Sequence, residues 1–313
     1  MNDTSQKNVL KVPDERPVEA LTIALLRDVK DACQALGTSF VLAGATARDI
    51  LMWHLHDRKA TVATRDVDIA VCAVSWEFHE ALIDLLIQTR RFARHPTQQQ
   101  KLLYTRGPED HVSELDIVPF GQIEARPGEL HWPPDGEVVM TVLGFQEAVD
   151  TAQPVDIGEG VVIPVLTVPA FVLLKIFAWQ DRRLKKNTDA SDLLFVLRNY
   201  FEAGNTARIF EEAMDQLEAF EFDVNLAAAA LLGREVSDLA YPETLAALRG
   251  LLQSAETYET LRRDLEARAA TILGGFVDDS DALLKAFAEE VLGKRSESGN
   301  AISGHEAEPA AKA

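Results

Sequence analysis

The chain has 313 residues, of which 47% are hydrophobic and 26% charged, and its formal net charge is −19. These proportions are ordinary for a globular protein, and the length allows two modest domains or one domain with a helical extension. So large an acid excess argues against a protein that wraps nucleic acid over a broad surface, because phosphate binding draws on clusters of Lys and Arg. A local basic patch is still compatible with it, and most of the acids are best explained by solubility.

The sequence predicts a cytoplasmic protein. Its first residues lack the apolar core of a signal peptide, and no apolar stretch approaches the ~18 residues of a membrane span. The two cysteines, Cys33 and Cys72, lie in apolar segments, which suits a reducing compartment. The seven histidines show no spacing that is typical of a zinc site.

Helical and strand patterns alternate over the first half of the chain. Apolar periodicity and Gly or Pro breakers predict helices over 17–36, 46–55 and 76–90. Short apolar or alternating runs predict strands over 39–43, 64–71, 101–105, 112–118, 137–142 and 161–166. The remainder of 121–160 is rich in loop-forming residues.

Strand signals almost disappear after Pro169. Helical patterns follow over 169–181, 189–203, 206–219, 224–233, 242–253, 255–273 and 280–292. The sequence therefore predicts an α/β (α+β) fold, in which a small mixed sheet of a handful of strands has helices on one face. We expect this sheet domain over 17–167, a helical domain over 168–293 and a disordered tail over 294–313.

Two aspartates, Asp66 and Asp68, stand one residue apart where acids alternate with Val and Ile. Alternate side chains of a strand project from one face, so both carboxylates would point together. That arrangement is what two Mg²⁺ ions need to hold a nucleoside triphosphate. Solvated surface acids are the alternative for the pair taken alone. The apolar residues 69–73 that follow favour the edge of the core, where close like charges repel unless a cation lies between them.

A third acid, Asp116, lies between Leu115 and Ile117 in another apolar strand. A carboxylate in such a strand is costly unless it is paired, hydrogen-bonded or bound to a metal. Asp116 is therefore a candidate third metal ligand. A salt bridge to Arg48 or Arg65 is the alternative.

Gly44 joins an expected strand to an expected helix, where backbone amides could receive phosphate oxygens. Thr46 and Arg48 stand beside it, and the strand of the aspartate pair follows directly after the helix. A glycine needed only for the turn is the alternative, as is an ordinary surface pair of Arg48 with Asp49.

Two cations of the helical half, Lys175 and Arg182, are seven residues apart and would share one helix face. They could contact a triphosphate or stabilise charge that develops on it; a solvated helix face is the alternative. The run from Arg182 to Lys186 is the densest basic cluster and a candidate patch for the end of a nucleic acid. Asp189 and Asp192 follow at a helix start, where Asp189 is better explained as a charge complement to the helix dipole.

Taken together, these residues resemble the polymerase-beta-type nucleotidyltransferase superfamily, in which a Gly-small turn opens a helix before an acid-x-acid strand and a third acid on a neighbouring strand. The segment Gly44–Asp49 is similar to the head motif of CCA-adding enzymes. The Lys-x-x-Ala-x-x-x-Arg pattern from Lys175 to Arg182, with the two acids after it, is similar to AbiEii-type nucleotidyltransferase toxins. The resemblance spans residues 38–198.

The resemblance implies a role for each matching residue. Asp66, Asp68 and Asp116 would be the catalytic residues and would bind two Mg²⁺ ions, with Asp116 facing the acceptor. The nucleotide would be bound by a set of seven residues: Gly44, Ala45, Thr46, Arg48, Arg65, Lys175 and Arg182. Two positions depart from the family pattern. Ala45 stands where Gly or Ser is usual, and Thr188 stands where a Lys commonly precedes the Asp-x-x-Asp pair.

This family membership would imply an enzyme that moves a nucleoside monophosphate from ATP or another nucleoside triphosphate to a hydroxyl group. The acceptor could be the 3′ end of an RNA, particularly tRNA, or a hydroxyl of a protein or small molecule; the basic run favours RNA. The protein would be a toxin of a toxin–antitoxin system, with an antitoxin protein as partner and no membrane. A non-catalytic nucleotide-binding protein of the same fold and an antibiotic-modifying nucleotidyltransferase are the alternatives.

Overall fold

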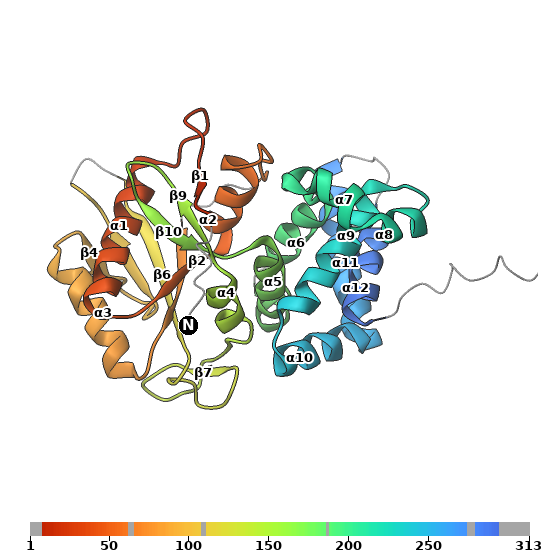
Figure 1. Ribbon diagram of the computed structural model, residues 1–313. Helices are drawn as coiled ribbons and strands as arrows, with labels where there is room; N and C mark the ends of the chain where they lie inside the picture. Colours follow the sequence, from red (N-terminus) through yellow and green to blue (C-terminus); the bar gives the residue numbers. More distant parts are fainter. Residues whose placement is uncertain (1–7, 62–65, 108–110, 186–187, 274–278, 294–313) are drawn as a thin grey trace, which may run out of the picture.

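A mixed sheet of eight strands forms the first half of the protein (Figure 1). The computed structural model describes residues 8–61, 66–107, 111–185, 188–273 and 279–293. Across the sheet, the strands are β1 (Leu10–Lys11), β9 (Gln153–Asp156), β10 (Val162–Val165), β2 (Phe40–Ala43), β3 (Asp66–Cys72), β6 (Ser113–Phe120), β5 (Lys101–Tyr104) and β4 (Phe92–Arg94). A separate hairpin consists of β7 (Glu129–His131) and β8 (Val139–Thr141).

The central strands have mixed directions. β3 runs parallel to β6 and antiparallel to β2, while β5 runs antiparallel to β6. The predicted mixed α/β fold is confirmed, but the sheet is larger than the handful of strands expected. The additional strands β1, β4 and β9 are two to four residues long. Runs this short carry too little alternation to be recognised in a sequence.

Helices lie on both sides of the sheet, so the expectation of helices on one face was wrong. α1 (Ala20–Ala35) and α3 (Trp76–Gln88) pack together on the side away from the helical half (Figure 1). On the other side, α4 (Phe145–Thr151) packs on β2, and β2 is buried along its whole length. The chain leaves β2 through α2 (Gly44–Arg48), which continues as the π-helical turn η1 (Asp49–His54).

The second half is helical, as predicted. It comprises α5 (Val168–Arg182), α6 (Thr188–Asn199), the π-helical segment η2 (Phe201–Asn205), α7 (Thr206–Glu212), α8 (Met214–Ala219), α9 (Val224–Leu239), α10 (Pro242–Gln253), α11 (Ala255–Leu273) and α12 (Ser280–Val291). The helix expected over 206–219 is broken at Ala213, whose φ and ψ are −129° and 30°. In the described part of the chain no helix is both long and apolar enough to cross a membrane.

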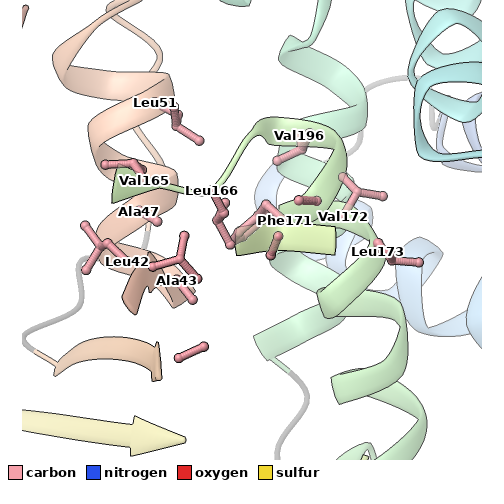
Figure 2. Packing of buried hydrophobic residues seen from close by; sticks show 14 of the residues in the cluster. Leu42, Ala43, Ala47, Leu51, Val165, Leu166, Phe171, Val172, Leu173 and Val196 are labelled. Atoms are coloured by element: carbon pink, nitrogen blue, oxygen red, sulfur yellow. The ribbon is translucent and has the colours of Figure 1, made fainter. Parts of the chain in front are cut away.

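Apolar side chains join the two halves. Leu42 of β2 and Leu51 of η1 face Leu166 and Phe171, which lie just before and within α5 (Figure 2). All of these belong to a single buried cluster that continues into the helical half. Each fully buried side chain of this size contributes roughly 1.5–3 kcal/mol. The same contact places α5 over the end of β2, where the turn at Gly44 begins.

Candidate active site

The register of two neighbouring strands brings the predicted carboxylates together. β3 and β6 pair in parallel, so that Asp68 lies beside Asp116 and Asp66 beside Glu114. Residues paired in this way project from the same face of a sheet. Val67 lies between the two aspartates on β3 and pairs with Leu115 on β6. Both side chains are buried on the opposite face of the sheet. The structure therefore places Asp66, Asp68 and Asp116 on one face of adjacent central strands.

Gly44 lies directly against this face. Its φ of +64° is in the left-handed region, where side chains other than glycine are strained. A Cβ atom at this position would lie only 2.0 Å from Oδ2 of Asp68. Glycine is therefore required here twice, once by the backbone and once by the close approach of the Asp68 carboxylate. The alternative of a glycine needed only for the turn does not account for the second requirement.

Thr46 connects the start of α2 to the strand that carries Asp66 and Asp68. Its hydroxyl donates a hydrogen bond of 2.8 Å to the backbone carbonyl of Asp66. This bond fixes the beginning of β3 relative to the turn at Gly44. Ala45, which stands between the two, is half-buried. Arg65 lies outside the described residues.

Lys101 is a site residue that the sequence analysis missed. β5 places it opposite Asp116, on the face that carries the acids. Its Nζ lies 2.5 Å from Glu114, 3.2 Å from Asp116 and 3.5 Å from Asp66. Burial alone would lower the pKa of Lys101, but the hydrogen bond to Glu114 and the charges of Asp116 and Asp66 raise it above its ordinary value. Among the described residues, Lys101 is thus the cation that the structure records in an ion pair with Asp116.

The pKa of Asp116 is strongly perturbed. Burial raises its pKa to about 6, and the negative charge of Asp68 adds to the shift, while Lys101 opposes it. Its Oδ2 contacts Lys101, whereas its Oδ1 is buried and has no hydrogen-bond partner among the residues that the structure describes. A buried acceptor without a partner is rare in proteins and calls for an explanation.

The carboxylates suit a divalent cation by their chemistry. Mg²⁺ is bound mostly by carboxylate and water oxygens, and the buried Oδ1 of Asp116 offers such an oxygen. In the part of the chain that the structure describes, however, no three His, Cys, Asp or Glu side chains already converge as metal ligands. The ammonium of Lys101 lies among these carboxylates instead.

A second ionic cluster links α5 and α6 to α2. Lys175 Nζ lies 2.9 Å from Asp189 and 2.7 Å from Asp192. Arg182 contacts both oxygens of Asp189 at 2.7 Å. Arg48 reaches across from α2 and forms an ion pair with Asp192. This α5–α6 cluster therefore connects the helical half to the helix that starts at Gly44.

Three interpretations of these residues need correction. Asp189 is completely buried; burial would raise its pKa, but Arg182 and Lys175 hold it below the ordinary value. It is thus an ion-pair partner as well as an acid at a helix start. Lys175 is 8% exposed and does not lie on a solvated helix face. Arg48 does pair with Asp49, at 2.6 Å, but it is 3% exposed, so this is no surface pair.

A cavity of about 700 Å³ opens between the carboxylates and α5. Gly44, Asp68 and Asp116 belong to its lining, and Lys175 and Arg182 line it from α5. The hairpin β7–β8, in a segment expected to be mostly loop, supplies an apolar wall that includes Trp132. This volume is within the range of small-molecule sites. The cavity thus brings together residues that the sequence connected only through a resemblance.

Comparison with known proteins identifies the family. The family model described as "Nucleotidyl transferase AbiEii toxin, Type IV TA system" matches residues 25–288. No curated protein matches significantly.

Several solved structures are similar in part. An antigenic nucleotidyltransferase-like protein from Paracoccidioides brasiliensis is 16% identical, with a TM-score of 0.38 over 66% of this chain and 94% of that one. The antibiotic-resistance factor ANT(2'')-Ia, in complex with adenylyl-2''-tobramycin, is 14% identical, with a TM-score of 0.35 over 68% and 98%. The Thermotoga maritima CCA-adding enzyme in complex with tRNA is 14% identical, with a TM-score of 0.23 over 90% and 82%. Likenesses this weak do not establish a shared substrate.

The family match covers the carboxylate strands, the turn at Gly44, the cations of α5 and most of the helical half. The chain is therefore a nucleotidyltransferase and belongs to the AbiEii family.

Proposed function

We propose that the protein transfers a nucleoside monophosphate from a nucleoside triphosphate to a hydroxyl acceptor, and that Asp66, Asp68 and Asp116 bind the Mg²⁺ ions this reaction uses. The observation that carries the proposal is the close packing of Gly44 on Asp68, beside a buried Asp116 oxygen that has no partner among the described residues. Gly44, Asp68 and Asp116 all line the cavity. A site that served only to bind a neutral ligand would not need three acids on one face.

The site residues would have different roles in the reaction. Two Mg²⁺ ions, when bound to the three carboxylates, would neutralise charge on the triphosphate and polarise the α-phosphorus. Asp116 would bind the metal and help to remove the proton of the acceptor hydroxyl. The acceptor oxygen then bonds to the α-phosphorus, the bond from that phosphorus to the bridging oxygen breaks, and pyrophosphate leaves.

Of the three cations predicted to contact the nucleotide in the described residues, Arg182 is the one best placed to do so. Arg182 keeps 42% of its side chain exposed and lines the cavity, which supports a role on the triphosphate or the departing pyrophosphate. Its pKa is raised, first by the hydrogen bond to Asp189, and the nearby Asp68 and Asp116 add to the shift. Lys175 and Arg48 are engaged by buried aspartates, so we expect them mainly to hold α5 and the Gly44 turn in position.

We further propose an RNA acceptor, specifically the 3′ end of tRNA. Lys185 lines the cavity beside Arg182, and it belongs to the densest basic run of an otherwise acidic chain. Lys186, the end of that run, lies outside the described residues. The family's description as the toxin of a type IV system supports a toxin role in the cytoplasm and an antitoxin partner.

Label transfer tests the function and the acceptor together. The protein is incubated with each α-labelled nucleoside triphosphate, Mg²⁺ and either intact tRNA or tRNA whose terminal diol has been oxidised by periodate. We expect transfer to intact tRNA only, with loss in EDTA and at least a 100-fold loss in Asp68→Asn, as is typical when a charge-stabilising group is removed. Asp84→Asn, an exposed acid on α3, is the matched control and should keep full activity.

Two results would count against this proposal. If the Asp68→Asn variant still transfers the labelled nucleotide, the carboxylates do not take part in the reaction. Transfer to aminoglycosides but not to tRNA would replace RNA by a small cationic acceptor, for which the acidic chain is suited.

A further inference from the structure

Lys101 occupies an unusual position among the acids. Its side chain is 11% exposed, and its ammonium lies within 3.5 Å of carboxylates from both β3 and β6. β5 fixes its backbone opposite Asp116, so this placement follows from the sheet and not from a chance surface rotamer. A single positive charge thus lies where the metal-binding function proposed above requires divalent cations.

The ammonium and a divalent cation would bind the same carboxylates. Lys101 contacts Oδ2 of Asp66 and Oδ2 of Asp116. Two cations a few ångströms apart repel each other strongly when neither is fully solvated. Binding of Mg²⁺ by Asp66 and Asp116 therefore requires Lys101 to withdraw, at least in part.

Glu114 is the carboxylate toward which the ammonium of Lys101 can move. It makes the shortest of the three contacts, at 2.5 Å, and its side chain is 35% exposed at the rim of the acid cluster. Its Oε2 already accepts a hydrogen bond from the ammonium of Lys101. Glu114 is a neighbour of Asp66 in the parallel ladder, so little side-chain movement is needed.

We propose that Lys101 is the resident counter-ion of the carboxylate site: it holds Asp66 and Asp116 in place in the metal-free protein and competes with the divalent cation for them, while Glu114 receives its ammonium when the cation binds. This inference rests on the proposed function, because it assumes that these carboxylates bind a metal. Lys101 and Glu114 are positioning residues in this scheme.

The scheme predicts opposite effects for the two residues. Lys101→Met removes the competitor, so the Kd for Mn²⁺ should fall ~10-fold, while the metal-free protein unfolds at a lower temperature because its acids repel each other. Glu114→Gln removes the alternative partner, so Lys101 should hold Asp66 and Asp116 more firmly and the Kd should rise several-fold. Lys101→Arg keeps the charge and should leave the Kd within about twofold of the wild type.

The measurement is a titration of the whole protein with Mn²⁺, in which the signal of free Mn²⁺ is followed by electron paramagnetic resonance and unfolding temperatures are recorded with EDTA and with Mn²⁺. Lys285→Met is the matched control, since it removes one lysine charge from the exposed face of α12. Asp68→Asn tests whether the metal binds at this site at all.

The outcomes separate the two proposals. If Asp68→Asn abolishes binding but Lys101→Met and Lys285→Met give the same Kd, the counter-ion role is overturned and the proposed function stands. The counter-ion role is also overturned if Lys101→Met lowers the unfolding temperature equally with and without Mn²⁺. If Asp68→Asn binds Mn²⁺ as the wild type does, the metal site itself is wrong. Should Lys101→Met not fold, a Kd for Glu114→Gln equal to that of the wild type overturns the inference on its own.

Discussion

Gly44 is the residue whose replacement most directly tests the geometry of the site. In Gly44→Ala the new methyl group would meet the Asp68 carboxylate, and the positive φ would be strained as well. Gly37→Ala is the matched control, because Gly37 has a φ of +66° but nothing within 4 Å of the added carbon. We expect both variants to lose about 1 kcal/mol of stability from the backbone, and only Gly44→Ala to lose transferase activity. Equal activity losses in the two variants would show that backbone strain, and not the contact with Asp68, matters.

A second prediction concerns His79, a buried histidine outside the site. It packs edge-on against Trp76 and Trp132, and burial lowers its pKa from 6.5 to about 4. The unfolded chain therefore takes up a proton near pH 6.5 that the folded protein takes up only near pH 4. The contribution of His79 to stability is complete above pH 6.5 and falls as the pH drops toward 4, by about 2 kcal/mol between pH 7 and pH 5.

Urea unfolding at several pH values measures this effect. His79→Phe should lose the part of the pH dependence that His79 contributes, so the stability of the wild type relative to the variant should fall between pH 7 and pH 5. A difference between them that does not change with pH would contradict the assignment.

At the scale of elements, the α5–α6 cluster connects the helical half to the Gly44 turn. In Asp192→Asn, both Arg48 and Lys175 lose a charged partner in a buried setting. Removing one member of a buried ion pair costs about 3–5 kcal/mol, because the remaining charges are poorly solvated. We expect a loss of that size in the free energy of unfolding. Glu80→Gln, which breaks an exposed ion pair with Arg94, should cost less than about 1 kcal/mol. Equal losses of unfolding free energy in the two variants would show that the α5–α6 cluster stabilises the protein no more than an exposed ion pair does.

The elements also show what the sequence can and cannot predict. β3 was predictable because acids alternate with apolar residues along it, and this alternation already places Asp66 and Asp68 on one face. Lys101 was not, because its role depends on the register of β5 against β6, which no local pattern reveals. Asp189 does lie in the first turn of a helix, as predicted, but its ion pairs with Lys175 and Arg182 were not predictable, because they depend on the packing of two helices.

At the scale of the molecule, we propose that the sheet half and the helical half form one cooperative unit, although the sequence suggested two domains. The buried cluster runs without interruption from β2 through α5 into the helical half. A fragment ending at residue 167 would expose Leu42, Leu51 and Leu166 (Figure 2). We expect calorimetry of the whole chain to give one transition with equal calorimetric and van't Hoff enthalpies, and the fragment to aggregate. Two transitions, or a soluble folded fragment, would support separate domains.

The central claim is that the carboxylates beside Gly44 hold the metal and the nucleotide together. It is tested most directly by a crystal structure with Mn²⁺ and a non-hydrolysable nucleoside triphosphate, in which anomalous scattering locates the metal. We expect anomalous peaks bound by Asp68 and Asp116, with Lys101 turned toward Glu114 and the triphosphate between Gly44 and Arg182. A nucleotide bound elsewhere, or a bound nucleotide with no metal on these carboxylates, would contradict it.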